Sequence, residues 1–161
     1  MAARGWLDSA EERLRGTPVL VPHLGAMVHV SQAQLAISAW DIQPVPDRLA
    51  QAYRLARASR DAPIAAGVAV AVAQWLLACG DPDRAAELLG VADALRGCTD
   101  LGNPDVVTTA SACQAALGRQ AFDFAAARGA EAGHEGALRR LGDAIGVCDE
   151  SGPVSVVSRR T

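Results

Sequence analysis

The sequence predicts an all-α fold: a tetratricopeptide-like helical repeat in which antiparallel helix pairs stack into a right-handed superhelix. A Pro-Asp-Arg pattern opens apolar stretches at 46–50 and 82–86, 36 residues apart, and helical stretches in the same phase occur at 10–14 and 118–122. This spacing is close to the period of about 34 residues in tetratricopeptide repeats. In addition, 50% of the residues are hydrophobic but only 4% are aromatic. The core is therefore expected to consist mainly of alanine, leucine and valine, and alanine is the strongest helix former.

Cap and break signals place the individual helices. The expected N-caps are Thr17, Asp61, Asp81 and Asn103. A proline follows each of them by one or two residues, in the first turn of the helix, where its missing N–H costs nothing. Breaks are expected at 41–46, Gly80 and Gly118, with a kink at Pro22. The expected helices cover residues 6–15, 18–40, 47–59, 62–79, 82–96, 104–117, 119–128 and 135–145.

Apolar residues follow helical spacing in the two best-defined stretches. One inward face is expected to carry Leu49, Ala52, Tyr53 and Ala56, and another Leu88, Leu89, Ala92 and Leu95. The tight connection at 80–82 requires the two helices that it joins to pack antiparallel. The one β signal is the alternation of Val68, Val70 and Val72, which would form a strand if the helical interpretation failed.

A single helical-repeat domain is expected over 1–146, followed by a disordered tail over 147–161 that is rich in glycine, proline and serine. The runs 16–40 and 62–80 contain no Asp, Glu, Lys or Arg. Prolines and histidines interrupt the first and alanine dominates the second, whereas a spanning helix needs about 20 strongly apolar residues. Both are interpreted as inner helices and not as membrane spans. No signal peptide is visible, and a cytoplasmic protein is expected.

The charge pattern argues against direct contact with nucleic acid. The chain has 15 basic residues, all arginine, against 18 acidic ones, and its formal net charge is −3 with the signs interspersed. A nucleic-acid-binding surface needs basic residues concentrated on one face. The doublets at 139–140 and 159–160 are isolated.

The cysteines indicate reduced thiols. They share no short metal-binding spacing, and we expect Cys79 and Cys113 to face the core as small hydrophobic residues. The four positions are Cys79, Cys98, Cys113 and Cys148.

No pattern predicts catalysis, a cofactor or a metal site, so we expect a non-enzymatic protein. Glu131 and His134 have the Glu-x-x-His spacing of di-iron bundles, but that site needs a second such pair and the chain has none. His23 and His29 fall on different helix faces and are interpreted as packed or surface residues.

The three tryptophans can be read in two ways. Trp6, Trp40 and Trp75 are either aromatic anchors for a partner or packing residues. We favour packing, with Trp75 in the core and Trp40 covering a helix end.

Several motifs follow one another from residue 60 onward: Arg-Asp-Ala-Pro at 60–63, Gly-Asp-Pro-Asp-Arg-Ala-Ala-Glu-Leu-Leu-Gly at 80–90, Ala-Leu-Arg-Gly at 94–97, Asn-Pro-Asp-Val at 103–106 and Ala-Leu-Gly-Arg-Gln-Ala-Phe at 116–122. As a set they resemble the C-terminal helical region of actinobacterial AfsR/SARP-type transcriptional regulators, which contain a bacterial transcriptional activator domain, and of related LuxR-type regulators. That family continues with Ala-Arg-Gly-Arg-Ala-Leu. Here 127–131 reads Ala-Arg-Gly-Ala-Glu, so the match departs after Ala-Arg-Gly.

The resemblance implies a sensing or interaction arm that follows a DNA-binding domain and an ATPase module. This chain carries neither a Gly-rich phosphate loop nor a helix-turn-helix with a basic recognition helix. We therefore expect a fragment or remnant of a regulator that acts as a non-catalytic protein-interaction or sensor module. The alternative is a small-ligand-binding effector domain of the all-α type. An open groove would favour the first, and a closed apolar cavity the second.

The N-terminal helices are the expected interface. The first helix is in phase with the second helix of a repeat, so the helix at 18–40 is expected to lack its usual antiparallel predecessor. Exposed apolar patches above roughly a few hundred Å² mark interaction sites. We expect homodimerisation, or docking of a protein partner or an upstream regulator domain, through Leu20, Leu24, Met27, Val28, Leu35 and Trp40.

Overall fold

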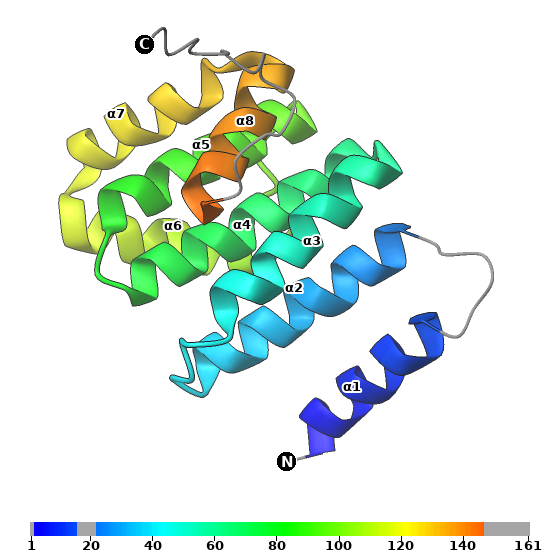
Figure 1. The fold of residues 1–161 in the computed structure, drawn as a ribbon. Coiled ribbons are helices and arrows are strands. Elements are labelled where there is room, and N and C mark those ends of the chain that lie inside the picture. The colour runs from blue at the N-terminus through cyan, green and yellow to red at the C-terminus, as the bar shows by residue number, and fades with distance from the viewer. Residues whose placement is uncertain (1, 16–21, 147–161) are drawn as a thin grey trace, which may run out of the picture.

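The computed structural model describes residues 2–15 and 22–146 of the chain. Within these residues there are eight α-helices and no β-strand, so the predicted all-α class is confirmed (Figure 1). Val68, Val70 and Val72 lie inside a helix. The helices are α1 (Ala2–Arg15), α2 (Pro22–Ser38), α3 (Val45–Ser59), α4 (Ala62–Ala78), α5 (Pro82–Arg96), α6 (Pro104–Leu117), α7 (Arg119–Ala130) and α8 (Gly133–Ile145).

Side-chain caps fix the beginnings of α4, α5 and α6, as the sequence predicts. Asp61, Asp81 and Asn103 each accept a hydrogen bond from a backbone N–H two or three residues further on, at 3.4, 3.1 and 3.0 Å. Each cap is followed by a proline in the first two helical positions. These caps satisfy N–H groups that have no partner within the helix.

The beginning of α3 differs from the prediction. α2 is described from Pro22 onward, and the kink expected at this proline depends on residues 16–21, which lie outside the described residues. The expected cap at Thr17 lies outside the described residues, as does the tail at 147–161. α3 begins at Val45, two residues earlier than expected, because Pro46 fits into its first turn.

Two antiparallel helix pairs, α2 with α3 and α4 with α5, form the centre of the fold. α4 packs against its partner α5 and also against α2 and α3 of the other pair, and residues on most of its sides are buried, which confirms its interpretation as an inner helix. The residues expected on the inward faces of α3 and α5 are all buried. Alanine supplies more than half of the buried hydrophobic residues, so the helices lie close together.

Helices α6 and α7 do not form a third pair of this kind. α7 lies along α5 and contacts it more extensively than it contacts α6. The closest approach is at two glycines. A Cβ atom added to Gly90 would lie 1.9 Å from the carbonyl oxygen of Ala126, and one added to Gly129 would lie 2.0 Å from that of Glu87. Two helix backbones can approach this closely only where both carry glycine at the contact, because glycine has no Cβ atom.

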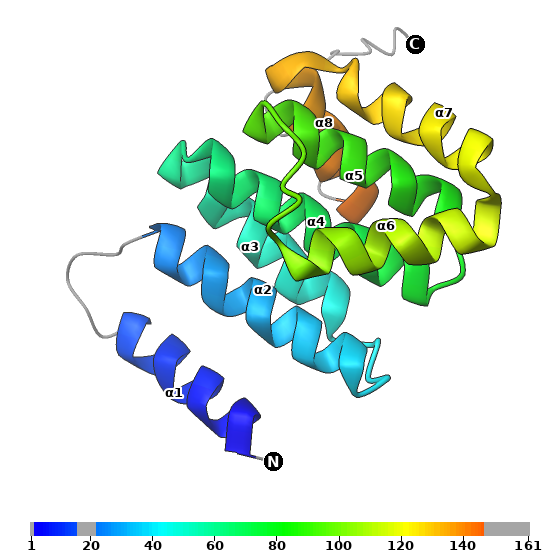
Figure 2. The ribbon, with the colours of Figure 1, turned by 180° about the vertical axis from the view of Figure 1, so that it is seen from behind.

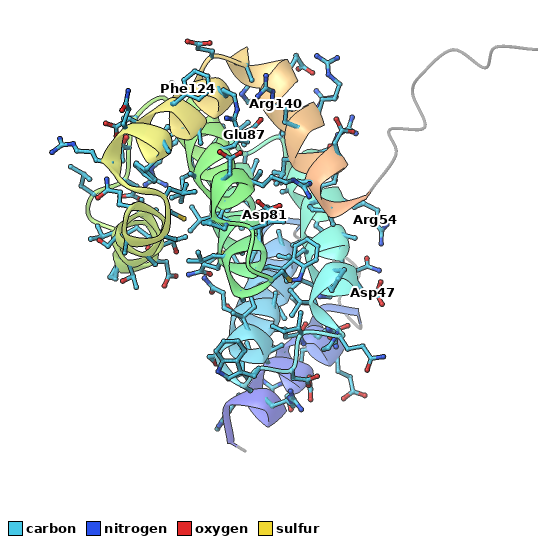
Figure 3. The ribbon with its side chains drawn as sticks, turned by 90° about the vertical axis from the view of Figure 1, so that its left-hand side faces the viewer. Asp47, Arg54, Asp81, Glu87, Phe124 and Arg140 are labelled. Atoms are coloured by element: carbon cyan, nitrogen blue, oxygen red, sulfur yellow. The ribbon has the colours of Figure 1, made fainter. Side chains whose placement is uncertain are left out.

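Ion pairs flank this crossing and extend to α8. Arg128 Nη2 lies 2.6 Å from Asp83 Oδ2 and 3.1 Å from Glu87 Oε2, and Arg140 Nη1 lies 2.6 Å from Glu87 Oε1. Figure 3 shows Glu87 and Arg140 near each other at the α5–α8 contact. The hydrogen bonds to Asp83 and Glu87 raise the pKa of Arg128 above its ordinary value. The motifs at 80–90 and 127–129 therefore contact each other and connect α5, α7 and α8.

Helix α8 also lies against α3. Tyr53 Oη donates a hydrogen bond to the carbonyl oxygen of Leu138 at 3.0 Å. Gly142 lies under the same ring, and a Cβ there would be 2.8 Å from Tyr53 Oη. α8 thus connects α3 and α5, which belong to different pairs.

Polar contacts join helix α1 to α2, to α3 and to the segment between them. Glu11 Oε2 accepts hydrogen bonds from Gln32 Nε2 and Arg48 Nη1, both at 2.9 Å, and Arg4 Nη2 lies 3.1 Å from Asp41 Oδ2. These contacts are exposed or only partly buried, and no described side chain of α1 belongs to the hydrophobic core. α1 is therefore held more weakly than the helices of the central pairs. None of the described helices is long and apolar enough to cross a membrane.

Candidate interaction groove

One hollow crosses three helices on the same side of the molecule. Its volume is about 520 Å³, it is open to solvent, and apolar atoms form most of its lining. Figure 2 shows α4 between α2 and α6 on this side. The lining residues are Gln34, Ile37, Ser38, Trp40, Gln74, Leu77, Ala78, Asp105, Thr108, Thr109 and Ala112.

Residue size explains why the surface is hollowed here. Ala78 and Ala112 leave space between α4 and α6 that larger side chains would fill. Ile37 and Leu77 are partly buried and pack against the core, so they provide firm apolar walls. Residues of packed helices therefore form the hollow, apart from Trp40 in the turn after α2.

Three of the lining residues form a polar cluster. Gln34 Nε2 donates hydrogen bonds to Gln74 Oε1 at 3.0 Å and to Asp105 Oδ2 at 2.9 Å. Asp105 is itself held in place, because its backbone N–H donates to the side chain of the cap Asn103. The cluster joins α2, α4 and α6, and it adds a carboxylate and amide groups to the lining of the hollow.

Trp40 stands at the edge of the hollow. It follows the end of α2 and is 79% exposed. The interpretation that Trp40 covers a helix end is therefore wrong, because the ring buries little against the protein. Trp75 packs partly buried against the core, as expected. Its Nε1 is buried without a hydrogen-bond partner.

The structure separates the predicted interface residues. Leu24 and Met27 are 43% and 52% exposed on the N-terminal half of α2. Val28 is half-buried, and Leu35 lies in a second hollow between α1 and α2. Trp40 belongs to the hollow on α2, α4 and α6. Leu20 lies outside the described residues.

A further hollow, of about 420 Å³, carries charged residues at the ends of α3, α4 and α8. It is lined by the predicted candidate His134 but not by its proposed companion Glu131. Among the described residues no three His, Cys, Asp or Glu side chains are grouped to hold a metal ion. His29 is buried, and its Nδ1 lies 3.2 Å from Gln32 Oε1, whereas His23 is exposed.

The cysteines differ from one another in exposure. Cys113 is buried in α6, as expected, and burial raises the pKa of its thiol. Cys79 is exposed just after the end of α4, so its predicted core position is wrong. The last turn of α4 leaves the core there, and a count of helical spacing does not reveal this.

Sequence reasoning missed Gln34, Gln74 and Asp105. The sequence did contain a signal. Gln34 and Gln74 are polar residues in the two runs that lack charged residues, 16–40 and 62–80, where a buried amide needs a hydrogen-bond partner. Their pairing across α2 and α4 could not be derived without the register of the two helices. No protein-family model, curated protein or solved structure matches this chain.

Proposed function

We propose that this chain is a non-catalytic interaction module of a bacterial transcriptional regulator, acting in the cytoplasm, and that it holds a segment of a protein partner in the hollow on α2, α4 and α6. The observation that carries the proposal is an open, mainly apolar hollow that crosses three helices and has an exposed tryptophan at its edge. Such surfaces bind protein segments through a few aromatic and aliphatic anchors. The motif resemblance in the C-terminal half supplies the link to regulators.

The proposal includes a tetratricopeptide-like arrangement. α2 with α3 and α4 with α5 are two repeats, and α6 is the first helix of a third. The contacts of α4 with both α2 and α6 support this assignment. In such arrays successive first helices form one extended binding surface. The pairs then stack as a right-handed superhelix, and α7 and α8 form its irregular C-terminal cap.

A protein partner fits the hollow better than a small molecule does. Small-molecule sites bury most of the ligand in a cleft or cavity. The hollow on α2, α4 and α6 is instead open, and apolar atoms form most of its lining. An effector domain for a small ligand remains the second candidate, and it would use an enclosed site.

Site-specific crosslinking tests the proposal. We expect p-benzoylphenylalanine at Ser38, an exposed residue in the hollow, to form one discrete protein adduct in the source bacterium, to be identified by mass spectrometry. The matched control carries the same group at Arg54, which points to solvent from α3 (Figure 3). The identified partner should then bind the purified full chain, and the Ser38 adduct should form with purified components.

Two outcomes of the crosslinking experiment would contradict the proposal. Equal adducts from both positions, or none from Ser38, would contradict a partner in this hollow. Stabilisation of the chain by a metabolite fraction, without any protein adduct, would favour the small-ligand candidate. For the regulator assignment, we expect a DNA-binding or ATPase domain encoded in frame upstream or carried by the identified partner.

A further inference from the structure

Trp40 occupies a backbone position where glycine is normal. Its φ is +57°, and only Trp40 and Arg60 have positive φ among the described residues other than glycine. After the end of α2, Trp40 N–H donates to the carbonyl of Ile37, and Asp41 N–H donates to that of Ala36. This left-handed turn ends the helix and aims the indole away from the core.

The same turn recurs after α4, and there glycine fills the position. Gly80 has φ +84°, and its N–H donates to the carbonyl of Leu77. Asp81 N–H donates to Leu76, just as Asp41 does to Ala36. Two equivalent helix ends therefore carry tryptophan in one case and glycine in the other.

Two energetic terms oppose a tryptophan at this position. The left-handed conformation is sterically unfavourable for an L-residue, and glycine avoids this strain. The indole is 79% exposed, so little burial offsets that cost. Arg60 is in the same conformation, but its side chain is charged and well solvated. A strained backbone that displays a large apolar ring points to a role in binding.

The chemistry around Trp40 indicates what would bind. Among the described lining residues Asp105 is the charged one, and none is basic. The face of an indole ring attracts cations, arginine in particular. Arginine also pairs with carboxylates through directed hydrogen bonds. Ile37 and Leu77 supply apolar walls beside these two groups.

We propose that Trp40 and Asp105 select a partner segment in which an arginine adjoins an aliphatic or aromatic residue. The apolar side chain lies between Ile37 and Leu77. The guanidinium group stacks on Trp40 and pairs with Asp105. This inference rests on the proposed function, because it assigns the chemistry of the segment that the hollow holds.

A random dodecapeptide display library, selected on the full chain, tests this specificity. We expect the enriched peptides to carry arginine beside an aliphatic or aromatic residue. A representative peptide should bind Trp40→Gly about tenfold or more weakly, as is typical for an aromatic hot-spot residue. Asp105→Asn should lose the preference for that peptide over its arginine-to-methionine version. Trp6→Ala is the matched control: Trp6 is 77% exposed on α1, outside the hollow, and its removal should leave binding unchanged.

Stability separates binding from folding. Trp40→Gly should unfold at a midpoint about 2–4 °C higher than the parent, because glycine relieves the left-handed strain. A lower midpoint would show that Trp40 is structural and would overturn the inference. Equal binding of the peptides to the parent and to Trp40→Gly, or enrichment of acidic peptides, would overturn it too.

Other outcomes identify where the failure lies. Peptides that crosslink at Ser38 but bind the Trp40→Gly and Asp105→Asn variants as tightly as the parent would overturn this inference and leave the proposed function intact. No enrichment together with no Ser38 adduct would overturn both. Competition by a synthetic peptide of residues 147–161 would show that the chain's own terminal segment is the occupant, and would overturn the claim of a separate partner.

Discussion

Gly90 in α5 and Gly129 in α7 mark the point where two helix backbones come closest. Both belong to the sequence motifs at 80–90 and 127–129, and the neighbouring Glu87 and Arg128 form an ion pair across the same crossing. The structure therefore gives these motifs a packing role: they determine how α7 lies on α5. A glycine inside a helix is normally unfavourable, and here the close crossing accounts for it.

Substitution of Gly90 should lower the stability of the fold far more than substitution of a helical glycine outside the crossing. Gly90→Ala forces the backbones apart and should lower the free energy of unfolding by about 3 kcal/mol. Gly67→Ala in α4 is the control. No atom lies within 4 Å of the added methyl group, so the higher helix propensity of alanine should raise stability by about 0.5–1 kcal/mol. Urea unfolding measures both. Equal stability of the two variants would contradict the packing role.

For single residues, the sequence predicts those structural roles that depend only on residues nearby in the chain. The caps Asp61, Asp81 and Asn103 were predictable because each bonds an N–H two or three residues away. The exposure of Cys79 and Trp40 was not, because it depends on which helices cover the end of each element. The same limit applies to the pairing of Gln34 with Asp105, which are distant in sequence.

Helix α1 differs from the others in how it is attached. Glu11 of α1 accepts hydrogen bonds from Gln32 of α2 and Arg48 of α3, and no described α1 side chain belongs to the hydrophobic core through which the central helices pack. Regions with few buried apolar contacts open locally at low free energy. We infer that α1 opens without unfolding of the central pairs.

Hydrogen exchange should reveal this opening. Amides of α1 should exchange faster than those of α4, and Arg48→Met should speed α1 exchange about two- to fivefold further, since a partly exposed ion pair contributes about 0.5–1 kcal/mol. Arg54→Met, on the exposed side of the same helix α3, is the control and should leave α1 unchanged. Exchange of α1 as slow as that of α4 would disprove the local opening.

At the level of elements, all eight helices were predicted in type and order. Periodicity and caps suffice for this because both are local signals. The position of α7 along α5 could not be predicted. A regular repeat would pair α7 mainly with α6, and only the meeting of Gly90 with Gly129 allows the closer crossing.

On the whole molecule, the apolar residues Leu24 and Met27 remain exposed although α1 covers part of α2. Self-association or docking through the N-terminal helices therefore stays a prediction. The hollow lies towards the other end of α2, at Gln34, Ile37 and Ser38. Two separate contact surfaces on one helix would let a second copy and a partner segment bind together.

Sedimentation can test the first of these surfaces. The full chain should form a concentration-dependent dimer, and Leu24→Glu with Met27→Glu should shift it to monomer, because burial of two carboxylates in an apolar contact is unfavourable. The control is Val107→Glu on α6, which is 44% exposed, similar to Leu24. A strictly monomeric parent, together with unchanged binding of any partner by the double variant, would refute the prediction.

The alanine-rich core has a consequence for how this protein tolerates mutation. A core built from leucine and phenylalanine is damaged mostly when side chains shrink and leave cavities. Here alanine fills just over half of the buried hydrophobic positions, and little can be removed from an alanine side chain. At these positions the damaging substitutions are those to larger residues, because a larger side chain forces neighbouring helices apart. The spacing of the helices thus sets an upper limit on side-chain volume at each buried alanine.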